Sequence, residues 1–172
     1  ALVDIGINDK PFMMDQRHME SILGPNADKV HKMTPEKLME VIRKVNNPVA
    51  IIHSRSKYNE NNSVVVVVDE TINGKPVIVP VRVSVEGEYN GVSIDINKMT
   101  SAYGRNHFAN LMEDALRTEL EGNKPGIYFY NKKKADFLRN QGVQFPIAAK
   151  NSGLIHKITD NPDFVKQTYY NP

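Results

Sequence analysis

The chain has 172 residues and 40% hydrophobic residues, which suits one domain with its own core. Its 22 basic and 20 acidic residues leave a net charge of +2, too small for a dedicated binder of duplex DNA, so any nucleic-acid site must be local. The absence of cysteine excludes disulfides, thiolate zinc sites and cysteine nucleophiles. The longest apolar run, Val64 to Val68, is too short to cross a bilayer, so we expect no membrane partner.

Two helices are predicted in the first 47 residues. Asp15 is a suitable N-cap for a short helix that Gly24 and Pro25 end. Thr34 and Pro35 fit the N-cap and first position of a second helix. This second helix has apolar residues at positions i, i+3, i+4 and i+7, which are Leu38, Val41, Ile42 and Val45.

After residue 48 the apolar period changes from helical to two, which predicts strands at 49–54, 63–69, 77–86 and 91–96. Asn73 and Gly74 form a turn dipeptide, so the second and third strands are expected to form a hairpin with one buried face. Pro80 cannot donate a ladder hydrogen bond and is expected at an edge, at a bulge, or where an N–H would point outward.

The remaining elements are a helix with an apolar stripe from Phe108 to Leu120, a strand at 127–130, a basic helix at 132–140 capped by Asn131, and a last strand at 154–158. The predicted class is therefore α+β, with N-terminal helices followed by a twisted antiparallel sheet and a helix packed on it. We expect a single domain over 1–172, with a helical lead (1–47), the sheet with inserted helices (48–158) and a tail (159–172). Because the chain begins with Ala1, we expect it to be part of a larger polypeptide.

Several familiar catalytic motifs are missing. The chain has no glycine-rich phosphate loop, HExxH motif, EF-hand loop or GxSxG elbow. Its five histidines do not pair with acidic residues at ligand-like spacing, so we expect neither a metal nor a cofactor. Any chemistry must then come from dispersed side chains that the fold brings together.

The segment 101–107 concentrates groups that bind or move protons and phosphates. Ser101, Tyr103, Arg105, Asn106 and His107 lie between a predicted strand and a predicted helix. The guanidinium and the first amides of the helix would both favour a phosphate. The structural alternative is that Ser101 or Asn106 only caps the helix and that Tyr103 packs in the core.

Three further segments are candidates. His156 lies in an apolar strand, where an imidazole could transfer protons in metal-free RNA cleavage or could simply be a partly buried histidine. Ser54 and Arg55, which follow His53, could contact phosphate, or could mark a strand that ends in solvent. The run 128–134 includes Tyr130, Lys132 and Lys133, which suit single-stranded RNA but also suit a buried strand followed by a solvated helix.

Together these segments resemble a known family. The order of NNPVAIIHSRS, NSVVVVVDETINGKPVIVPVRV, IDINKMTSAYGRNHFANLM, IYFYNKKK and SGLIHKI is similar to the C-terminal domain of phage MuF head proteins and of other phage polyvalent proteins. The resemblance covers Met13 to Ile158. That group is assigned to the nuclease fold shared by barnase, EndoU, colicin and RelE toxins.

The resemblance implies a metal-independent endoribonuclease that cleaves RNA by 2′-hydroxyl attack to a 2′,3′-cyclic phosphate. It also implies RNA, for example tRNA, as a partner, an immunity or inhibitor protein if the domain is a toxin, and a place in the bacterial cytoplasm or on the phage particle. The positions that match the family's recurring motif are Ser54, Ser101, Tyr103, Gly104, Arg105, Lys132, Lys133 and His156.

The expected catalytic set is His156, Tyr103, Arg105 and Ser101, and the expected substrate-binding set is Ser54, Arg55, Asn106, Tyr130, Lys132 and Lys133. This hypothesis requires the segment 101–107 and His156 to meet in one pocket. Barnase-like members use a glutamate as the base, but here no glutamate is placed opposite His156, so Tyr103, His53, His107 or a lysine would have to replace it. The alternatives are a module that binds nucleic acid or protein without catalysis, and a structural domain of a phage head or polyvalent protein.

Overall fold

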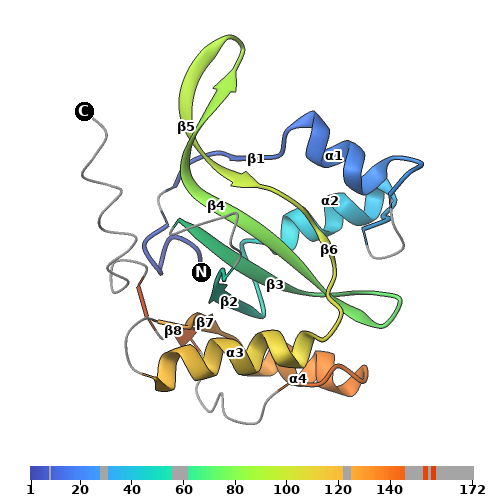
Figure 1. Cartoon of the computed structure of the whole chain (residues 1–172), viewed down its shortest axis with the longest axis vertical. Coiled ribbons are helices and arrows are strands. Elements are labelled where there is room, and N and C mark those ends of the chain that lie inside the picture. The colour runs from blue at the N-terminus through green and yellow to red at the C-terminus, as the bar shows by residue number, and fades with distance from the viewer. Residues whose placement is uncertain are drawn as a thin grey trace.

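The structure, a computed structural model, describes residues 1–7, 9–27, 31–55, 62–121, 125–145, 153–154 and 156–157. Within these residues, four helices cover the two faces of one eight-stranded sheet (Figure 1). This arrangement confirms the predicted α+β class.

The two N-terminal helices begin where their caps predict. Helix α1 (Gln16–Leu23) starts after Asp15, whose carboxylate accepts a hydrogen bond from the backbone N–H of His18. Helix α2 (Pro35–Lys44) starts after Thr34, whose hydroxyl accepts from the N–H of Lys37. In both helices a side-chain oxygen satisfies one of the free amides of the first turn, which is why the boundaries could be read locally.

The sheet is antiparallel except at one edge. Its order is β1-β5-β4-β3-β2-β7-β8, with β6 pairing on β4, and only the β1–β5 pair is parallel. The strands are β1 (Phe12–Met13), β2 (Ala50–His53), β3 (Ser63–Ile72), β4 (Lys75–Tyr89), β5 (Val92–Met99), β6 (Tyr103–Gly104), β7 (Ile127–Tyr130) and β8 (Gly153–Leu154). Strands β1 and β6 were not predicted, because two residues are too few to show a period.

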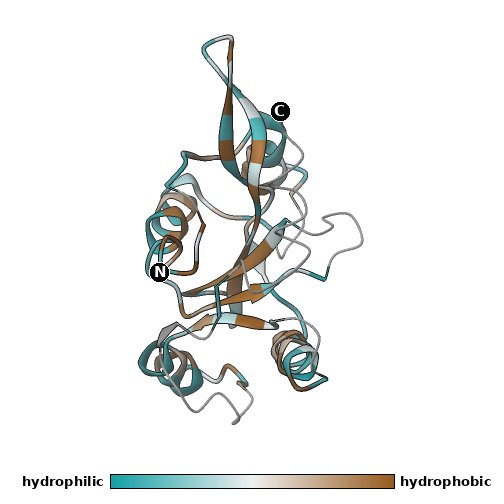
Figure 2. Ribbon diagram, turned by 90° about the vertical axis from the view of Figure 1, so that its left-hand side faces the viewer, coloured by the Kyte–Doolittle hydropathy of each residue, from teal (hydrophilic) through white to brown (hydrophobic). Residues whose placement is uncertain are grey.

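The central hairpin is buried more fully than predicted. Asn73 and Gly74 have φ of 51° and 73° and form the expected turn between β3 and β4. The prediction of one buried face was wrong for β3, since Val64 to Val68 are all buried. The reason is that helices cover both faces of the sheet, as the edge-on view shows (Figure 2).

The core therefore has two layers. On one face α1 and α2 pack against alternate residues of β3 and β4, with the N-terminal residues Leu2, Ile5 and Ile7 completing the layer. On the other face, helices α3 (Phe108–Leu120) and α4 (Lys132–Asn140) pack against Val65, Val67 and Ile78. The second layer leaves a groove beside α3.

Two details of the α3 and α4 region test the sequence predictions. Asn131 caps α4 as predicted, and Gly142 ends this region with the left-handed φ of 87° that favours glycine. Leu120 was wrongly placed in the apolar stripe of α3, because it is 85% exposed. At 100° per residue it lies about 120° around the helix from the buried Phe108.

Beyond the helices, β4 and β5 continue as a two-stranded ribbon that projects from the body (Figure 1). Glu86 and Glu88 lie in this part of β4. The predicted last strand, 154–158, is seen only in part, because β8 shares only Leu154 with it and His156 and Lys157 are not in a strand. Ile155, Ile158 and the tail 159–172 lie outside the described residues. None of the helices that the structure describes combines the length and the apolar character needed to span a bilayer.

Candidate functional site

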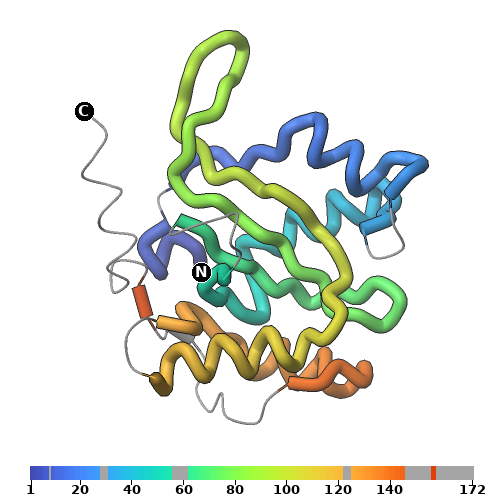
Figure 3. Tube along the Cα trace, in the orientation of Figure 1, coloured from blue at the N-terminus to red at the C-terminus, as the bar shows by residue number. Residues whose placement is uncertain are grey.

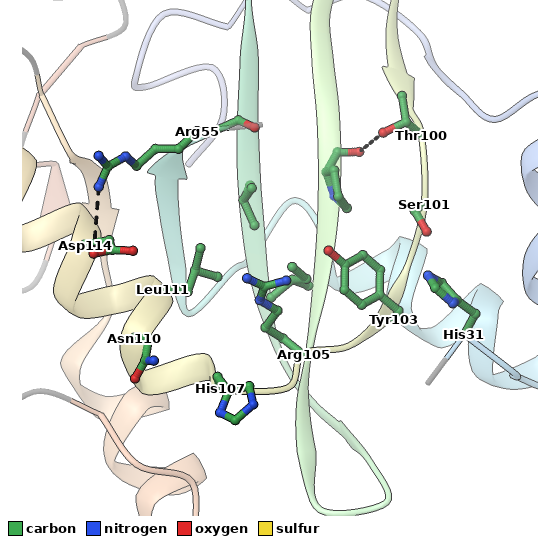
Figure 4. A pocket seen from close by; sticks show the side chains of 14 residues that line it. His31, Arg55, Thr100, Ser101, Tyr103, Arg105, His107, Asn110, Leu111 and Asp114 are labelled. Carbon is green, nitrogen blue, oxygen red and sulfur yellow. Dashed lines mark hydrogen bonds and ion pairs between the residues drawn. The ribbon is translucent and has the colours of Figure 1, made fainter. Parts of the chain in front are cut away.

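A groove of about 720 Å³ lies between α3 and the strands β3, β4 and β6, beside the end of β2. Its walls carry charged and proton-transferring side chains from four separate parts of the chain (Figure 4). They include His31, Ser54, Arg55, Ser101, Tyr103, Arg105, His107, Asn110 and Asp114. The fold therefore brings together four residues of the 101–107 segment with the two residues that follow His53.

The short strand β6 holds Tyr103 and Arg105 at the groove. The backbone N–H of Arg105 donates to Pro76 at 2.8 Å, and Gly104 lies so close to the β3–β4 turn that a Cβ would meet the carbonyl oxygen of Ile72 at 3.2 Å. Figure 3 follows the chain from β5 through this close contact into α3. Glycine at position 104 thus allows the two flanking functional residues to sit beside β4.

Pro80 marks the gap between β5 and β6 on the edge of β4. Its carbonyl accepts from the N–H of Thr100 at 3.0 Å, so the side of Pro80 without an N–H faces this gap. The prediction of a position whose N–H would point away from the ladder is confirmed. The interrupted ladder also leaves Thr100 and Ser101 free of regular pairing where they line the groove.

Arg105 has an unsatisfied donor. Its Nε is buried and has no hydrogen-bond partner among the residues that the structure describes. A buried donor without a partner costs about 1–3 kcal/mol, and more when the group is charged. The groove therefore contains a guanidinium whose Nε–H has no acceptor among the described residues.

Two histidines and a phenol line the same groove as this guanidinium. The rings of His31 and Tyr103 are 4.8 Å apart between centroids, and Figure 4 shows Arg105 between these rings and His107. His107 has a left-handed φ of 52° as the N-cap residue of α3, and its side chain makes no capping hydrogen bond. Neither Ser101 nor Asn106 caps the helix, because the N-cap residue is His107. The other half of the structural alternative is confirmed, since Tyr103 packs against the core layer of α3 and α4.

The far wall of the groove carries an ion pair. Nη1 of Arg55 lies 3.8 Å from Oδ1 of Asp114, in the middle of α3. With the histidines neutral, Arg55, Arg105 and Asp114 give the walls a net charge of 2 − 1 = +1. A local excess of positive charge favours an anionic ligand.

His156 lies outside the groove. Its Nε2 is 2.8 Å from Oε1 of Glu119, near the C-terminal end of α3. Glu119 is about 18 Å along the helix axis from His107, and β8 lies four strands from β4, or roughly 19 Å. The expectation that His156 and the 101–107 segment meet in one pocket is therefore not met.

The remaining predicted residues are also placed elsewhere. Tyr130 is fully buried, and its hydroxyl accepts from Arg139 at 3.4 Å. Burial raises the pKa of Tyr130 despite the nearby guanidinium. Lys132 and Lys133 are exposed on α4, and neither they nor Asn106 lines the groove. His53 contacts the hydroxyl of Tyr128 at 3.3 Å.

Three groove residues were missed by sequence reasoning. Asn110 and Asp114 follow His107 at i+3 and i+7, so helical spacing alone could have placed them on the same side of α3. His31 comes from the loop before α2, and no local pattern connects it with Tyr103. The partner of His156, Glu119, was missed for the same reason.

The described part of the chain has no cluster of side chains that could bind a metal ion. No group of three or more histidine, aspartate or glutamate side chains there is arranged to hold an ion. The residues of the groove offer two guanidinium groups and a single carboxylate, a set that suits an anion better than a divalent cation.

The family model of the phage MuF C-terminal domain matches residues 23–136. The chain belongs to this family. The matched range contains every residue that lines the groove of this MuF C-terminal domain, from His31 to Asp114. His156 lies outside the matched range. Searches of curated proteins and of solved structures found no match.

Proposed function

We propose that the groove binds RNA and cleaves it without a metal ion, through attack of a 2′-hydroxyl on the adjacent phosphorus to give a 2′,3′-cyclic phosphate. The observation that carries this proposal is the buried, unpartnered Nε of Arg105 in a groove that also holds His31 and His107. We also propose that the chain has the nuclease fold that barnase, EndoU, colicin and RelE toxins share, and that its partner is RNA.

Arg105 would hold the phosphate. Once the side chain turns to expose the buried Nε, one phosphate oxygen can accept from Nε while a second accepts from an Nη. This forms the bidentate, charge-assisted pair that guanidinium favours. The first amides of α3, which no side chain at the N-cap satisfies, would add to the attraction. Binding would supply the hydrogen bonds that Arg105 lacks in the free protein.

His31 and His107 would transfer the protons. One neutral imidazole accepts the proton of the 2′-hydroxyl as O2′ bonds to phosphorus, and the other, protonated, donates to O5′ as the P–O5′ bond breaks. Tyr103 and Ser101 would orient the ribose and phosphate by hydrogen bonds. The pair thus replaces the glutamate and His156 that the resemblance suggested.

The test is a cleavage assay with a single-stranded RNA in EDTA, with DNA of the same sequence as the control that lacks the nucleophile. We expect the wild type to cut only the RNA. Arg105→Gln and His107→Asn should each lower kcat by roughly 100-fold or more. Asparagine is chosen at 107 because it tolerates the left-handed backbone while removing the imidazole.

Arg43→Gln is the matched control, because Arg43 is an exposed arginine of α2 on the other face of the sheet. It should cleave like the wild type. The dependence of kcat/KM on pH should be bell-shaped, and one limb should be lost in His31→Gln. RNA binding that depends on Arg105 without any cleavage would instead assign the groove to a binding module.

A further inference from the structure

The groove contains a second cation, Arg55, that already has an anionic partner. Arg55 follows β2, and its guanidinium reaches α3, where it lies 3.8 Å from the carboxylate of Asp114 (Figure 4). Both residues line the groove, on the wall away from Tyr103. An anion that entered the groove would therefore meet Arg105 unpaired and Arg55 occupied.

The Arg55–Asp114 ion pair is weak, so Arg55 can exchange Asp114 for another anion. Its side chains are 56% and 43% exposed, and 3.8 Å is too long for a hydrogen bond. Ion pairs with this exposure contribute little because water screens them. Asp114 also has another partner on its own helix, since Nη2 of Arg117 lies 3.6 Å from the same oxygen.

A phosphate would be a better partner for Arg55. It can accept two parallel charge-assisted hydrogen bonds from the guanidinium, whereas Asp114 makes none to it in this geometry. When Arg55 turns to a phosphate, Arg117 remains beside Asp114, so the carboxylate is not left without a cation.

We propose that Arg55 forms a second phosphate subsite, which Asp114 occupies in the empty groove and releases to a phosphate of the bound strand. This proposal rests on the proposed function, because it takes RNA as the ligand. Asp114 is then a specificity-determining residue, since its carboxylate competes with every phosphate that enters the groove.

The arrangement selects a substrate class. A mononucleotide has one phosphate and can satisfy Arg105 alone, so it gains nothing from displacing Asp114. A single strand with two or more phosphates can engage Arg105 and Arg55 together, and the second contact offsets the loss of the ion pair. The substrate is therefore a single-stranded oligonucleotide or longer strand, and mononucleotides bind only at the Arg105 end.

The test measures the affinity for a single-stranded 2′-O-methyl oligoribonucleotide, which cannot be cleaved, by fluorescence anisotropy. Asp114→Asn should tighten binding by about two- to fivefold, as expected for the loss of an exposed competing charge. In the Arg55→Gln background the same substitution should have no effect. Arg117→Gln, which changes the other partner of Asp114 outside the groove wall, should not tighten binding.

Two further measurements test whether Arg55 contacts one phosphate of the bound strand. Arg55→Gln should reduce the slope of log K against log salt concentration by about 0.7, as expected for one phosphate contact on a single strand. The same variant should leave the affinity for uridine 5′-monophosphate unchanged.

The proposal is overturned if Asp114→Asn weakens binding, or if it has equal effects with and without Arg55. Should either result occur while Arg105→Gln still abolishes binding, only the second subsite is wrong. If Arg105→Gln binds the oligonucleotide as the wild type does, the proposed function fails as well.

Discussion

Arg105 shows how a single side chain becomes functional through its surroundings. Its backbone is tied to Pro76, its neighbour Gly104 permits the close approach of β6 to the β3–β4 turn, and its Nε is buried without a partner within the described residues. The sequence indicated Arg105 because it stands among other polar groups, but burial of one particular nitrogen is a property of the folded chain.

His31 and His156 illustrate what sequence reasoning could not determine. His156 was chosen because a histidine in an apolar strand is unusual, yet its partner is Glu119 and it does not line the groove. His31 is inconspicuous in the sequence and reaches Tyr103 only through tertiary packing. A local sequence pattern identifies unusual residues, but it does not show which side chains contact one another. Those contacts depend on the order of the strands in the sheet.

The Glu119–His156 pair yields a prediction at this scale. His156→Gln should change kcat/KM for RNA by less than about twofold, and should lower the free energy of unfolding by about 1 kcal/mol, since one charge-assisted hydrogen bond is lost. Glu119→Gln should have the same two effects. Urea unfolding and the cleavage assay check them together. Loss of cleavage in a folded His156→Gln protein would move the catalytic centre to this pair.

At the scale of elements, the helices were more predictable than the short strands. Asp15, Thr34 and Asn131 act as caps through oxygens that bond to amides three residues away, so the information is local. The two-residue strands β1 and β6 are defined by their partners in β5 and β4. The double burial of β3 likewise depends on which helices cover the sheet, and its valine run alone does not reveal this.

An ion-pair network joins α2, the end of β3 and α4. Glu70 accepts hydrogen bonds from Lys37 and Lys44, and Asp69 lies 3.6 Å from Lys44 and 3.3 Å from Lys134. Burial alone would raise the pKa of Glu70, but the two ammonium groups outweigh it and hold the pKa below its ordinary value of 4.5. The glutamate side chain is only 12% exposed, so solvent screens these contacts weakly.

The network predicts a pH-dependent stability. Because the pKa of Glu70 is lower in the folded state, its contribution is present above the unfolded pKa and is lost as the pH falls through the folded pKa. Glu70→Gln should therefore lower the free energy of unfolding by about 1–3 kcal/mol near neutral pH, and by less near pH ~3.

Urea unfolding at the two pH values measures this difference. Glu40→Gln is the matched control, because Glu40 contacts Lys37 at 3.3 Å but is 49% exposed, and should cost less than about 0.5 kcal/mol. An equal loss for Glu70→Gln at both pH values would contradict the assignment of this stability to the ionised carboxylate.

At the scale of the whole molecule, the candidate residues fall into two sets on the same face of the sheet, the face that α3 and α4 cover. The groove collects Ser54, Arg55, Ser101, Tyr103 and Arg105 from segments far apart in the sequence, while Tyr130, Lys132, Lys133 and His156 lie away from it. The α+β class followed from the order of periodic segments, and the family match is consistent with the resemblance of those segments. The position of the groove required the strand order and the register of β6 on β4.

The most direct measurement is an NMR titration of the isotope-labelled protein with a single-stranded 2′-O-methyl oligoribonucleotide, following the backbone amides and the arginine Nε–H signals. We predict that the Nε–H signal of Arg105 shifts and exchanges more slowly with water as it gains a phosphate partner, with amide shifts confined to the groove and the Arg43 signal unchanged. Saturable binding that leaves the Arg105 signal in place and shifts the region of Glu119 and His156 would contradict the account.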